Sequence, residues 1–318
     1  MDIKGKNFLL IGGAGLIGSH TLDQLLKEDV AKVTIFDNFT RGSFKNIEEA
    51  MKDSRVKIFE HGGDINQIDI LEKSMQNIDG VFHFAALWLL HCWDYPRSAF
   101  KTNIEGTFNV LEACIKSKIK KLIYSSSASV YGDAVEDPMT ENHPFNNTNF
   151  YGASKIAGEQ MAKAYHHRFG LNYLGLRYMN VYGPRQDYKG AYIAVIMKIL
   201  DNLSLNKSPV LYGDGKQAYD FISVKDCALA NICAMKSEKQ NEFYNVGTGI
   251  KTSLLELTNI ILEEYGSDLK IEFKEEGNTF VKNRVGDPTK AKKEIGFEYK
   301  IDLRKGIKDL IEWRKSIS

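Results

Sequence analysis

Short apolar runs alternate with amphipathic stretches of helical length along residues 8–176, and this rhythm restricts the folds open to the chain. The apolar runs are Phe8–Ile11, Val33–Phe36, Val56–Phe59, Val81–Phe84, Leu122–Tyr124 and Tyr173–Leu176, and the helical stretches are Leu16–Lys27, Gln67–Gln76, Ser98–Lys116 and Tyr151–Arg168. Parallel strands are buried on both faces and need crossover helices, so they produce this alternation. The sequence therefore predicts an α/β fold built on a Rossmann-type, doubly wound parallel sheet.

The composition favours small-molecule chemistry. The 318 residues include 42 Lys and Arg against 41 Asp and Glu, a net charge of +1, so neither nucleic acid nor an anionic membrane is an expected partner. The longest apolar run, Val81–Leu90, is about half the length that spans a bilayer, and the run ending at Gly12 is too short for a signal peptide. The four cysteines form no C-x-x-C pair, which favours a reducing, cytoplasmic location. His91 and Cys92 have no further ligand cluster beside them, so no metal site is expected.

A glycine-rich turn follows the first apolar run and opens the first helical stretch. Its glycines, Gly12, Gly15 and Gly18, would let the backbone approach a pyrophosphate, whose charge meets free N–H groups at the helix N-terminus. Asp37 ends the second run 19 positions after Gly18, where a carboxylate binds the adenosine ribose and disfavours a 2′-phosphate. Asp64, after the third run, is a further candidate for the adenine side. Together these residues predict that the cofactor is NAD rather than NADP.

Tyr151 and Lys155 stand at i and i+4, on one face of the helix that they begin. A phenol with a pKa of about 10 is a weak base at neutral pH, but a neighbouring ammonium stabilises its phenolate. Such a pair taken alone is more often a solvated helix face. The polar segment Ser125–Ser129, which follows a strand at the carboxyl edge of the sheet, favours catalysis instead. We assign Ser127 as the hydroxyl that relays the proton.

The rhythm of strands and helices changes after Gly183-Pro184. Residues 1–182 are expected to form the NAD-binding Rossmann domain, to which residues 223–250 return. Residues 183–318 are expected to form mainly a smaller α/β substrate-binding domain, beginning with a helix over Ala191–Asn202 and a strand near Val210-Leu211.

In their order along the chain, these motifs resemble the extended short-chain dehydrogenase/reductase family, and most closely its UDP-glucose 4-epimerase-like members. The resemblance covers nearly the whole chain and is carried by Gly12-x-x-Gly15-x-x-Gly18, Asp37-Asn38, Asp64-Ile65, His83–Ala86, Asn103, Ser127, Tyr151-x-x-x-Lys155 and Arg177–Asn180. It implies NAD contacts from Leu16, Ile17, Asp37, Asn38, Asp64, Ile65, Ala85, Asn103, Tyr151, Lys155 and Tyr178.

The resemblance also implies a substrate, a reaction and an assembly. Asn180 would lie near the diphosphate of a nucleotide sugar, and the helices after Pro96 and Tyr151 would form a homodimer through a four-helix bundle. In the implied 4-epimerase reaction, Tyr151 takes the proton of the C4 hydroxyl, NAD takes the C4 hydride, and the hydride returns to the other face of the keto sugar. UDP-hexose is the expected substrate.

Several substrate-side positions depart from the family pattern. The arginine that commonly binds the diphosphate is Tyr219 here, and a second one falls at Gly277. The candidate replacements are Arg185, Lys189, Lys282 and Arg284. Arg284 also occupies the position that controls room beside the sugar, so it is either a diphosphate ligand or a pocket residue that discriminates among sugars.

Three functions remain open from the sequence. The first is a nucleotide-sugar 4-epimerase. The second is a dehydrogenase, reductase or dehydratase of the same family. Dehydration is disfavoured because Ala128 and Ser129 stand where dehydratases and decarboxylases carry acids. The third is a non-catalytic NAD-sensing protein, against which the intact Ser127, Tyr151 and Lys155 argue.

Overall fold

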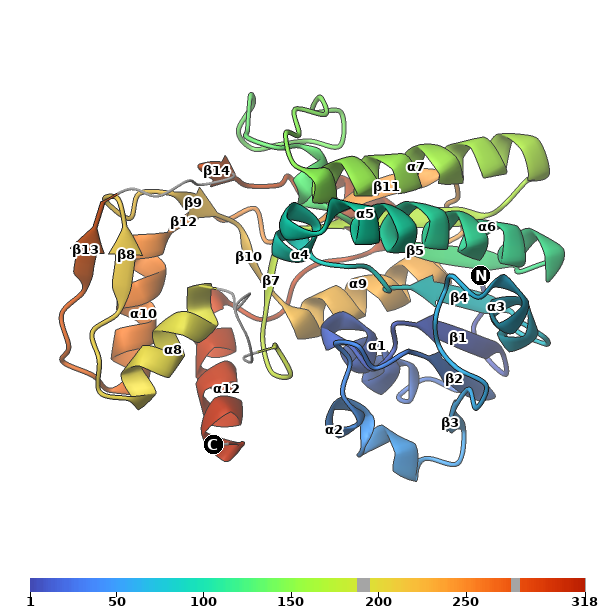
Figure 1. Cartoon of the computed structure of the whole chain (residues 1–318), viewed down its shortest axis with the longest axis horizontal. Helices are drawn as coiled ribbons and strands as arrows, with labels where there is room; N and C mark the ends of the chain where they lie inside the picture. Colours follow the sequence, from blue (N-terminus) through green and yellow to red (C-terminus); the bar gives the residue numbers. More distant parts are fainter. Residues whose placement is uncertain (188–194, 276–280, 318) are drawn as a thin grey trace.

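A parallel sheet with helices on both faces forms the larger part of the molecule, on the right in Figure 1. The structure, a computed structural model, describes residues 1–187, 195–275 and 281–317. The sheet has seven strands in the order β11-β6-β5-β4-β1-β2-β3, and each neighbouring pair is parallel. Its strands are β1 (Asn7–Ile11), β2 (Lys32–Phe36), β3 (Val56–Ile58), β4 (Gly80–His83), β5 (Lys121–Ser127), β6 (Tyr173–Tyr178) and β11 (Glu242–Val246). The predicted Rossmann-type, doubly wound fold is confirmed.

Helices cover the two faces of this sheet in separate sets. On one face α1 packs against α9, and on the other α6 packs between α3 and α7 (Figure 1). These helices are α1 (Leu16–Leu25), α3 (Ile68–Ser74), α6 (Gly106–Lys116), α7 (Phe150–Phe169) and α9 (Val224–Lys236). The shorter ones are α2 (Phe44–Ile47), α4 (Leu89–Asp94), α5 (Pro96–Ala99) and α11 (Thr289–Ile295), with single turns η1 (Ala50–Lys52) and η3 (Ala128–Val130).

The stretch Ser98–Lys116, predicted as one helix, is interrupted. A π-helical segment, η2 (Phe100–Glu105), joins α5 to α6. It holds the buried Asn103, whose amide hydrogen bonds to the backbone of Leu87 and to Ser154 rather than facing solvent. Because π-helical turns re-aim a side chain at the cost of regular hydrogen bonding, they are frequent near functional sites.

Smaller sheets and a second helix cluster flank the main sheet. β7 (Asn180–Tyr182) pairs with β10 (Phe221–Ser223), β9 (Ala218–Tyr219) lies between β12 (Thr252–Ser253) and β14 (Asn283–Arg284), and β8 (Val210–Tyr212) pairs with β13 (Glu272–Lys274). Helices α8 (Val195–Ser204), α10 (Leu254–Tyr265) and α12 (Leu303–Ser316) share an apolar core. The start of the helix predicted over Ala191–Asn202 lies outside the described residues.

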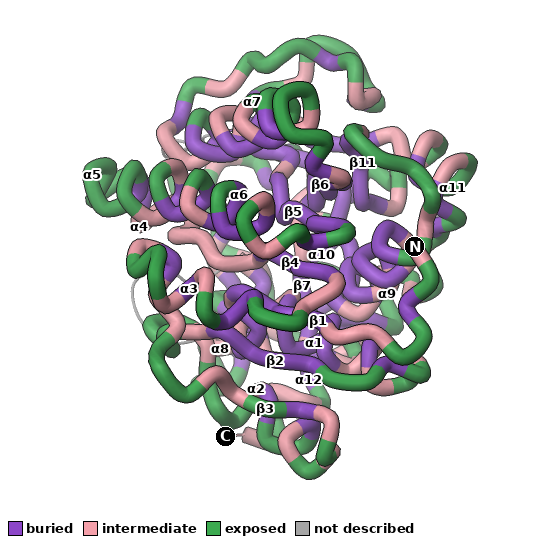
Figure 2. The backbone as a smooth tube through the Cα atoms, turned by 90° about the vertical axis from the view of Figure 1, so that its right-hand side faces the viewer, coloured by how far each residue is buried: buried purple, intermediate pink, exposed green. Residues whose placement is uncertain are grey.

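Burial follows the predicted parallel architecture. Phe8 to Ile11 of β1 are fully buried, as are Val81 and Phe82 of β4. The tube view shows the central strands buried and the outer helical turns exposed (Figure 2). Within the described residues, no helix combines the length and the apolar character that crossing a bilayer requires. The main sheet is therefore a rigid support for the residues at its carboxyl edge.

Candidate active site

A cleft of about 790 Å³ opens at the carboxyl ends of the strands. Strand order reverses between β1 and β4, and such switch points are where doubly wound sheets bind ligands. Most of the predicted cofactor residues line this cleft: Gly12, Gly15, Leu16, Ile17, Gly18, Asp37, Asn38, Asp64, Ile65, Ala85, Tyr151, Lys155 and Tyr178. Arg185 lines it as well. The structure thus gathers residues as far apart in the sequence as Gly12 and Arg185 into one cavity.

The glycine-rich turn requires glycine at defined positions. Gly12 has a φ of +79°, and a Cβ atom added there would lie 2.7 Å from the backbone nitrogen of Ala85. A Cβ at Gly18 would lie 2.4 Å from the carbonyl oxygen of Gly12. Gly15 precedes α1 and has no side chain to cap it. The backbone N–H groups at the start of α1 are thus available to an anion such as a pyrophosphate.

The acids after β2 and β3 suit the adenosine half of NAD. The Asp37 carboxylate accepts hydrogen bonds from the backbone nitrogens of Ala14 (2.9 Å) and Phe39 (2.8 Å), so it is fixed beside the glycine turn. Burial raises the pKa of Asp37, and these two N–H donors oppose the rise. Asp64 accepts from the backbone and side chain of Asn66 at 2.9 and 2.8 Å. The cleft therefore fits an adenosine ribose with free 2′ and 3′ hydroxyls.

The catalytic candidates come from two adjacent elements. Helix α7 begins at Phe150 because the Asn149 side chain accepts a 2.8 Å hydrogen bond from Gly152. This start places Tyr151 and Lys155 in the first two turns, facing the sheet. The ammonium of Lys155 donates to the Ser125 carbonyl at 2.7 Å and lies 5.7 Å from the centre of the Tyr151 ring. Ser127 ends β5 beside them.

The electrostatics of these groups follow from burial. Burial lowers the pKa of Lys155 to about 8, since an ammonium is poorly stabilised away from water. Burial also raises the pKa of the Tyr151 phenol, and a hydrogen bond with the Ser127 hydroxyl opposes the rise. Without a further positive charge the phenol stays protonated at neutral pH. The oxidised nicotinamide of NAD carries such a charge, so the tyrosine is suited to act once the cofactor is bound.

Ser127, Asn103, Asn180 and Arg284 are not among the residues that line the cleft. Asn103 is buried behind it, where its amide bridges Leu87 and Ser154. Asn180 donates to the Asp220 carbonyl through its backbone (2.9 Å), and Arg284 lies on β14. Arg185, although it lines the cleft, forms an ion pair with Asp23 at 2.8 Å. Their assignment to cofactor or substrate remains a prediction.

Sequence reasoning missed a contact that crosses the cleft. The Arg41 guanidinium lies 4.1 Å from the centre of the Trp88 ring, and its Nε lies 3.3 Å from the Asp187 carboxylate. Three separate loops meet here, those after β2, β4 and β7. The sequence signal for this contact was a long cation four positions after Asp37.

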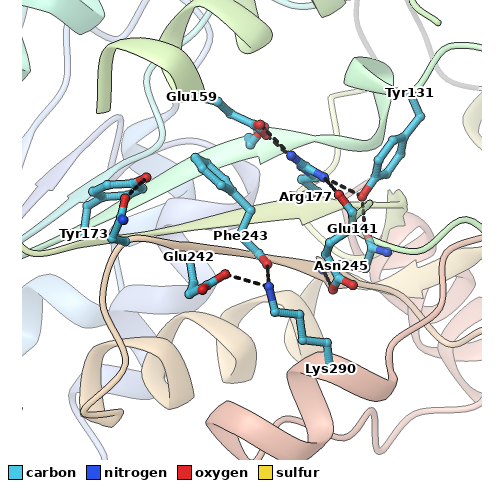
Figure 3. Close-up of polar contacts among 11 residues, drawn as sticks. Tyr131, Glu141, Glu159, Tyr173, Arg177, Glu242, Phe243, Asn245 and Lys290 are labelled. Carbon is cyan, nitrogen blue, oxygen red and sulfur yellow. Dashed lines mark hydrogen bonds and ion pairs between the residues drawn. The ribbon is translucent and has the colours of Figure 1, made fainter. Parts of the chain in front are cut away.

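A buried polar network behind Ser127 was also missed (Figure 3). Arg177 of β6 donates to both carboxylate oxygens of Glu159 at 2.8 and 2.7 Å, and to the Tyr131 hydroxyl at 2.9 Å. Ser126 donates to Glu159 at 2.6 Å, and Tyr131 donates to Asn245 at 2.6 Å. The network ties α7, β5, β6 and β11 together directly behind the catalytic candidates. Glu159 continues the i, i+4 series of Tyr151 and Lys155, which was a usable signal.

No group of three or more His, Cys, Asp and Glu in the described chain is arranged to hold a metal ion. His91 lies against Trp88 with ring centres 5.0 Å apart, and Cys92 is fully buried. Burial raises the pKa of Cys92 to about 11, so its thiol is a poor nucleophile at neutral pH.

The dinucleotide cleft and the tyrosine on its wall place the protein in the class of short-chain dehydrogenases and reductases. Within that class, the chain belongs to the NAD dependent epimerase/dehydratase family, whose family model matches residues 8–247. It is therefore an NAD-dependent enzyme, as the sequence predicted.

Known proteins match over the full length of the chain. A Methanocaldococcus jannaschii protein provisionally named a UDP-glucose 4-epimerase is 37% identical, over 97% of this chain and 98% of its own. The structure of a UDP-N-acetylglucosamine 4-epimerase from Methanobrevibacter ruminantium, in complex with UDP-N-acetylmuramic acid, is 34% identical with a TM-score of 0.93, over 99% and 100% of the chains. That of a UDP-glucuronic acid 4-epimerase from Bacillus cereus, with UDP-glucuronic acid and NAD, is 28% identical with a TM-score of 0.90, over 98% and 100%.

The two unusual substrate-side positions have different outcomes. Tyr219 donates its hydroxyl to the Val281 carbonyl at 2.8 Å, so it is committed to the protein itself. Gly277 lies outside the described residues, as does Lys189.

Proposed function

We propose that this enzyme is a nucleotide-sugar 4-epimerase, and that UDP-hexoses are its substrate class. The observation that carries the proposal is the Tyr151 phenol on the wall of the NAD cleft, with the Lys155 ammonium 5.7 Å from the centre of its ring and the Ser127 hydroxyl in hydrogen-bond contact. A putative UDP-glucose 4-epimerase that matches over the full length of the chain, and the structures of two UDP-sugar 4-epimerases with the same fold, support the substrate class. Within the family, reaction type is decided by the groups around the sugar, so these groups must discriminate among the alternatives.

In the proposed reaction Tyr151 moves a proton and Lys155 sets the charge around it. The Tyr151 oxygen takes the proton of the C4 hydroxyl, and the Ser127 hydroxyl holds that oxygen in line. NAD, when bound, supplies the acceptor for the C4 hydride. Lys155 would favour the phenolate and would donate to the nicotinamide ribose. The keto sugar would then rotate within the pocket, so that its opposite face receives the hydride. Tyr151 would return the proton to the C4 oxygen. The net redox change is zero.

The acids of the cleft argue against dehydration. Elimination at C5 and C6 needs an acid and a base beside those carbons. Asp37 and Asp64 lie at the adenosine end of the cleft, and Asp187 pairs with Arg41. The positions that follow Ser127 are Ala128 and Ser129, both buried and without a carboxylate. Simple oxidation and return of the hydride is the chemistry that these groups support.

The proposal includes the division of labour between the two parts of the chain. Residues 1–182, with 223–250, hold NAD, and residues 183–318 mainly hold the nucleotide sugar. Asn180 and Arg185 lie at their junction, Asn180 through its bond to Asp220 and Arg185 on the cleft wall. We assign both to the diphosphate side of the substrate.

A homodimer through the helices after Pro96 and Tyr151 is also part of the proposal. Phe100 and Phe108 are 53% and 43% exposed, and Phe169 at the end of α7 is 45% exposed. Helices α6 and α7 are neighbours, so a second copy would bury these rings in a four-helix bundle. The four free cysteines agree with the proposed cytoplasmic location.

Product analysis tests the function directly. Purified holoenzyme is incubated with UDP-, GDP-, dTDP- and CDP-hexoses, and the sugar products are identified by NMR. The proposal expects a C4 epimer with no net change in NADH absorbance. A released keto or reduced sugar would assign a dehydrogenase or reductase instead, and a 4-keto-6-deoxy sugar would assign a dehydratase. NAD binding with no turnover of any sugar would favour the NAD-sensing alternative.

A further inference from the structure

Arg284 is a buried cation that lacks a partner in the described part of the chain. Its residue is 9% exposed, and its Nε makes no hydrogen bond with the described residues. By contrast, the buried Arg177 makes four hydrogen bonds. A guanidinium taken out of water is costly unless an anion compensates it, so buried charges are normally paired. No anion that hydrogen bonds to the Arg284 guanidinium is present among the described residues.

The nearby acids of the protein are already engaged elsewhere. Asp220 is fully buried, and its carboxylate accepts hydrogen bonds from the backbone of Thr248 and Gly249 and from the Thr248 hydroxyl. Asp133 is exposed and accepts from the backbone nitrogens of Lys282 and Asn283 at 2.9 and 3.1 Å. Backbone N–H groups thus occupy both carboxylates, and neither forms a hydrogen bond or ion pair with the Arg284 side chain in the described residues. Burial lowers the pKa of Arg284, and the negative charge of Asp133 opposes this larger effect.

The strand that carries Arg284 is attached to the segment that connects the catalytic residues. The Met139 backbone nitrogen donates to the Val285 carbonyl at 2.8 Å. The Asp133 carboxylate accepts a hydrogen bond from the backbone of Lys282, three residues before Val285. Met139 and Asp133 belong to the loop between Ser127 and Tyr151, which runs beside β14 (Figure 1). On its other edge β14 pairs with β9, where Arg284 lies opposite Tyr219. The backbone thus fixes Arg284 beside the loop that joins Ser127 to Tyr151.

We propose that Arg284 binds a carboxylate carried by the sugar of the substrate, so that the enzyme acts on nucleotide-activated acidic sugars. This inference rests on the proposed nucleotide-sugar substrate and adds that its sugar carries a negative charge. A planar guanidinium with several donors matches a carboxylate better than a hydroxyl or an acetamido group. The positive charge acts on the phenol that would hold the C4 hydroxyl: it lowers the pKa of Tyr151 against the larger effect of burial. Burial in turn lowers the pKa of Arg284 to about 10, and a bound carboxylate would restore it.

The test compares binding within two matched pairs of ligands. UDP-glucuronate and UDP-glucose differ by a carboxylate at C6, and UDP-N-acetylmuramate and UDP-N-acetylglucosamine differ by a lactyl carboxylate at C3. Dissociation constants are measured by calorimetry with NAD-saturated wild type, Arg284→Met and Arg284→Lys. Arg304→Gln is the control, because Arg304 is exposed and pairs with Glu263 and Glu264 on the surface. Each result is a ratio within a pair, so it does not depend on affinity for the nucleotide.

The wild type is expected to bind the acidic member of at least one pair about 30-fold or more tightly than the neutral member. Arg284→Met should bring that ratio close to one, Arg284→Lys should keep part of it, and Arg304→Gln should leave it unchanged. Arg284→Met should also unfold at a higher temperature without ligand, because it removes an unpaired buried charge.

Two results would overturn the inference. An equal loss of affinity for both members of each pair would place Arg284 on the diphosphate. A wild type that binds acidic and neutral sugars alike would remove the acidic substrate altogether. Either result is compatible with 4-epimerase activity on neutral sugars. Conversely, acid-selective binding without a C4 epimer would refute the proposed reaction and leave the role of Arg284 intact.

Discussion

Replacing Glu159 with glutamine removes the negative half of a buried ion pair and leaves the shape of the side chain nearly unchanged. The side chains of Glu159 and Arg177 are 0% and 4% exposed. Burial works against the charge of Arg177, but the hydrogen bonds that Arg177 donates to Glu159 and the negative charge of that carboxylate help to keep its pKa above the ordinary value. Breaking such a pair from one side costs about 3–5 kcal/mol, because the other charge stays buried without its partner. An unfolding entropy of about 0.7 kcal/mol per degree for a chain of this length converts that into a fall in Tm of about 4–8 °C.

Thermal unfolding followed by circular dichroism with saturating NAD measures this change. Glu298→Gln is a matched control, since Glu298 forms a 2.7 Å ion pair with Lys292 in which both side chains are about half exposed or more. Such surface pairs contribute about 0–1 kcal/mol, so the control should shift Tm by no more than about 2 °C. Replacing both partners, as Glu159→Leu with Arg177→Met, should recover much of the stability lost in Glu159→Gln.

The same variant should also lose activity, because Ser126 donates to Glu159 and stands next to Ser127. A Glu159→Gln protein whose Tm falls no further than that of Glu298→Gln would refute the reasoning. The buried pair would then contribute no more than a surface pair, and the network could not be what holds β5 against α7.

Three further predictions concern the cleft. Tyr151→Phe should keep its Tm and bound NAD but lose about 10²–10⁴-fold in turnover, the usual contribution of a positioned acid or base; a wild-type rate would remove Tyr151 from the mechanism. The Lys155 ammonium has its pKa lowered to about 8 by burial, so the folded protein binds fewer protons than the unfolded one between pH 8 and the ordinary lysine value. Any stability advantage of Lys155→Met over wild type in denaturant titrations should therefore be largest below pH 8 and shrink as the pH rises, and an advantage that grows with pH would contradict this sign. Arg41→Ala should release NADH faster in a stopped-flow fluorescence assay, because it removes the contacts to Trp88 and Asp187 that cross the cleft, and an unchanged rate would show that they do not retain the cofactor.

The parts of the site that the sequence could predict depend on local patterns. The glycine turn, Asp37 and the Tyr151–Lys155 pair each belong to a single element with a fixed spacing, and their burial at the carboxyl edge follows from the order of strands. The break of the predicted helix over Ser98–Lys116 could not be foreseen, because it depends on Asn103 reaching Leu87 and Ser154.

Contacts between distant elements account for what the sequence did not reveal. Arg41 meets Asp187 across 146 positions, and the side chains come from loops whose conformation has no periodic signal. For Arg284 the sequence left two roles open, because the deciding facts are three-dimensional: the strand is buried, and its acidic neighbours are used by the backbone. The type and position of Arg284 therefore defined two possible roles, and only the packing around Arg284 supplied an argument for one of them.

The proposed reaction also gives a reason for the contact of Arg41 with Trp88 and Asp187, which crosses the cleft. In an epimerisation the hydride removed from the sugar must return to the same molecule, so the cofactor is neither consumed nor exchanged between turnovers. A dehydrogenase, by contrast, must release reduced cofactor each cycle. The Arg41 guanidinium, held by the Trp88 ring on one side and the Asp187 carboxylate on another, joins loops from three parts of the sheet edge. The need to open that contact slows cofactor exchange but does not hinder a reaction that never requires exchange, which is why the contact fits an epimerase better than a dehydrogenase.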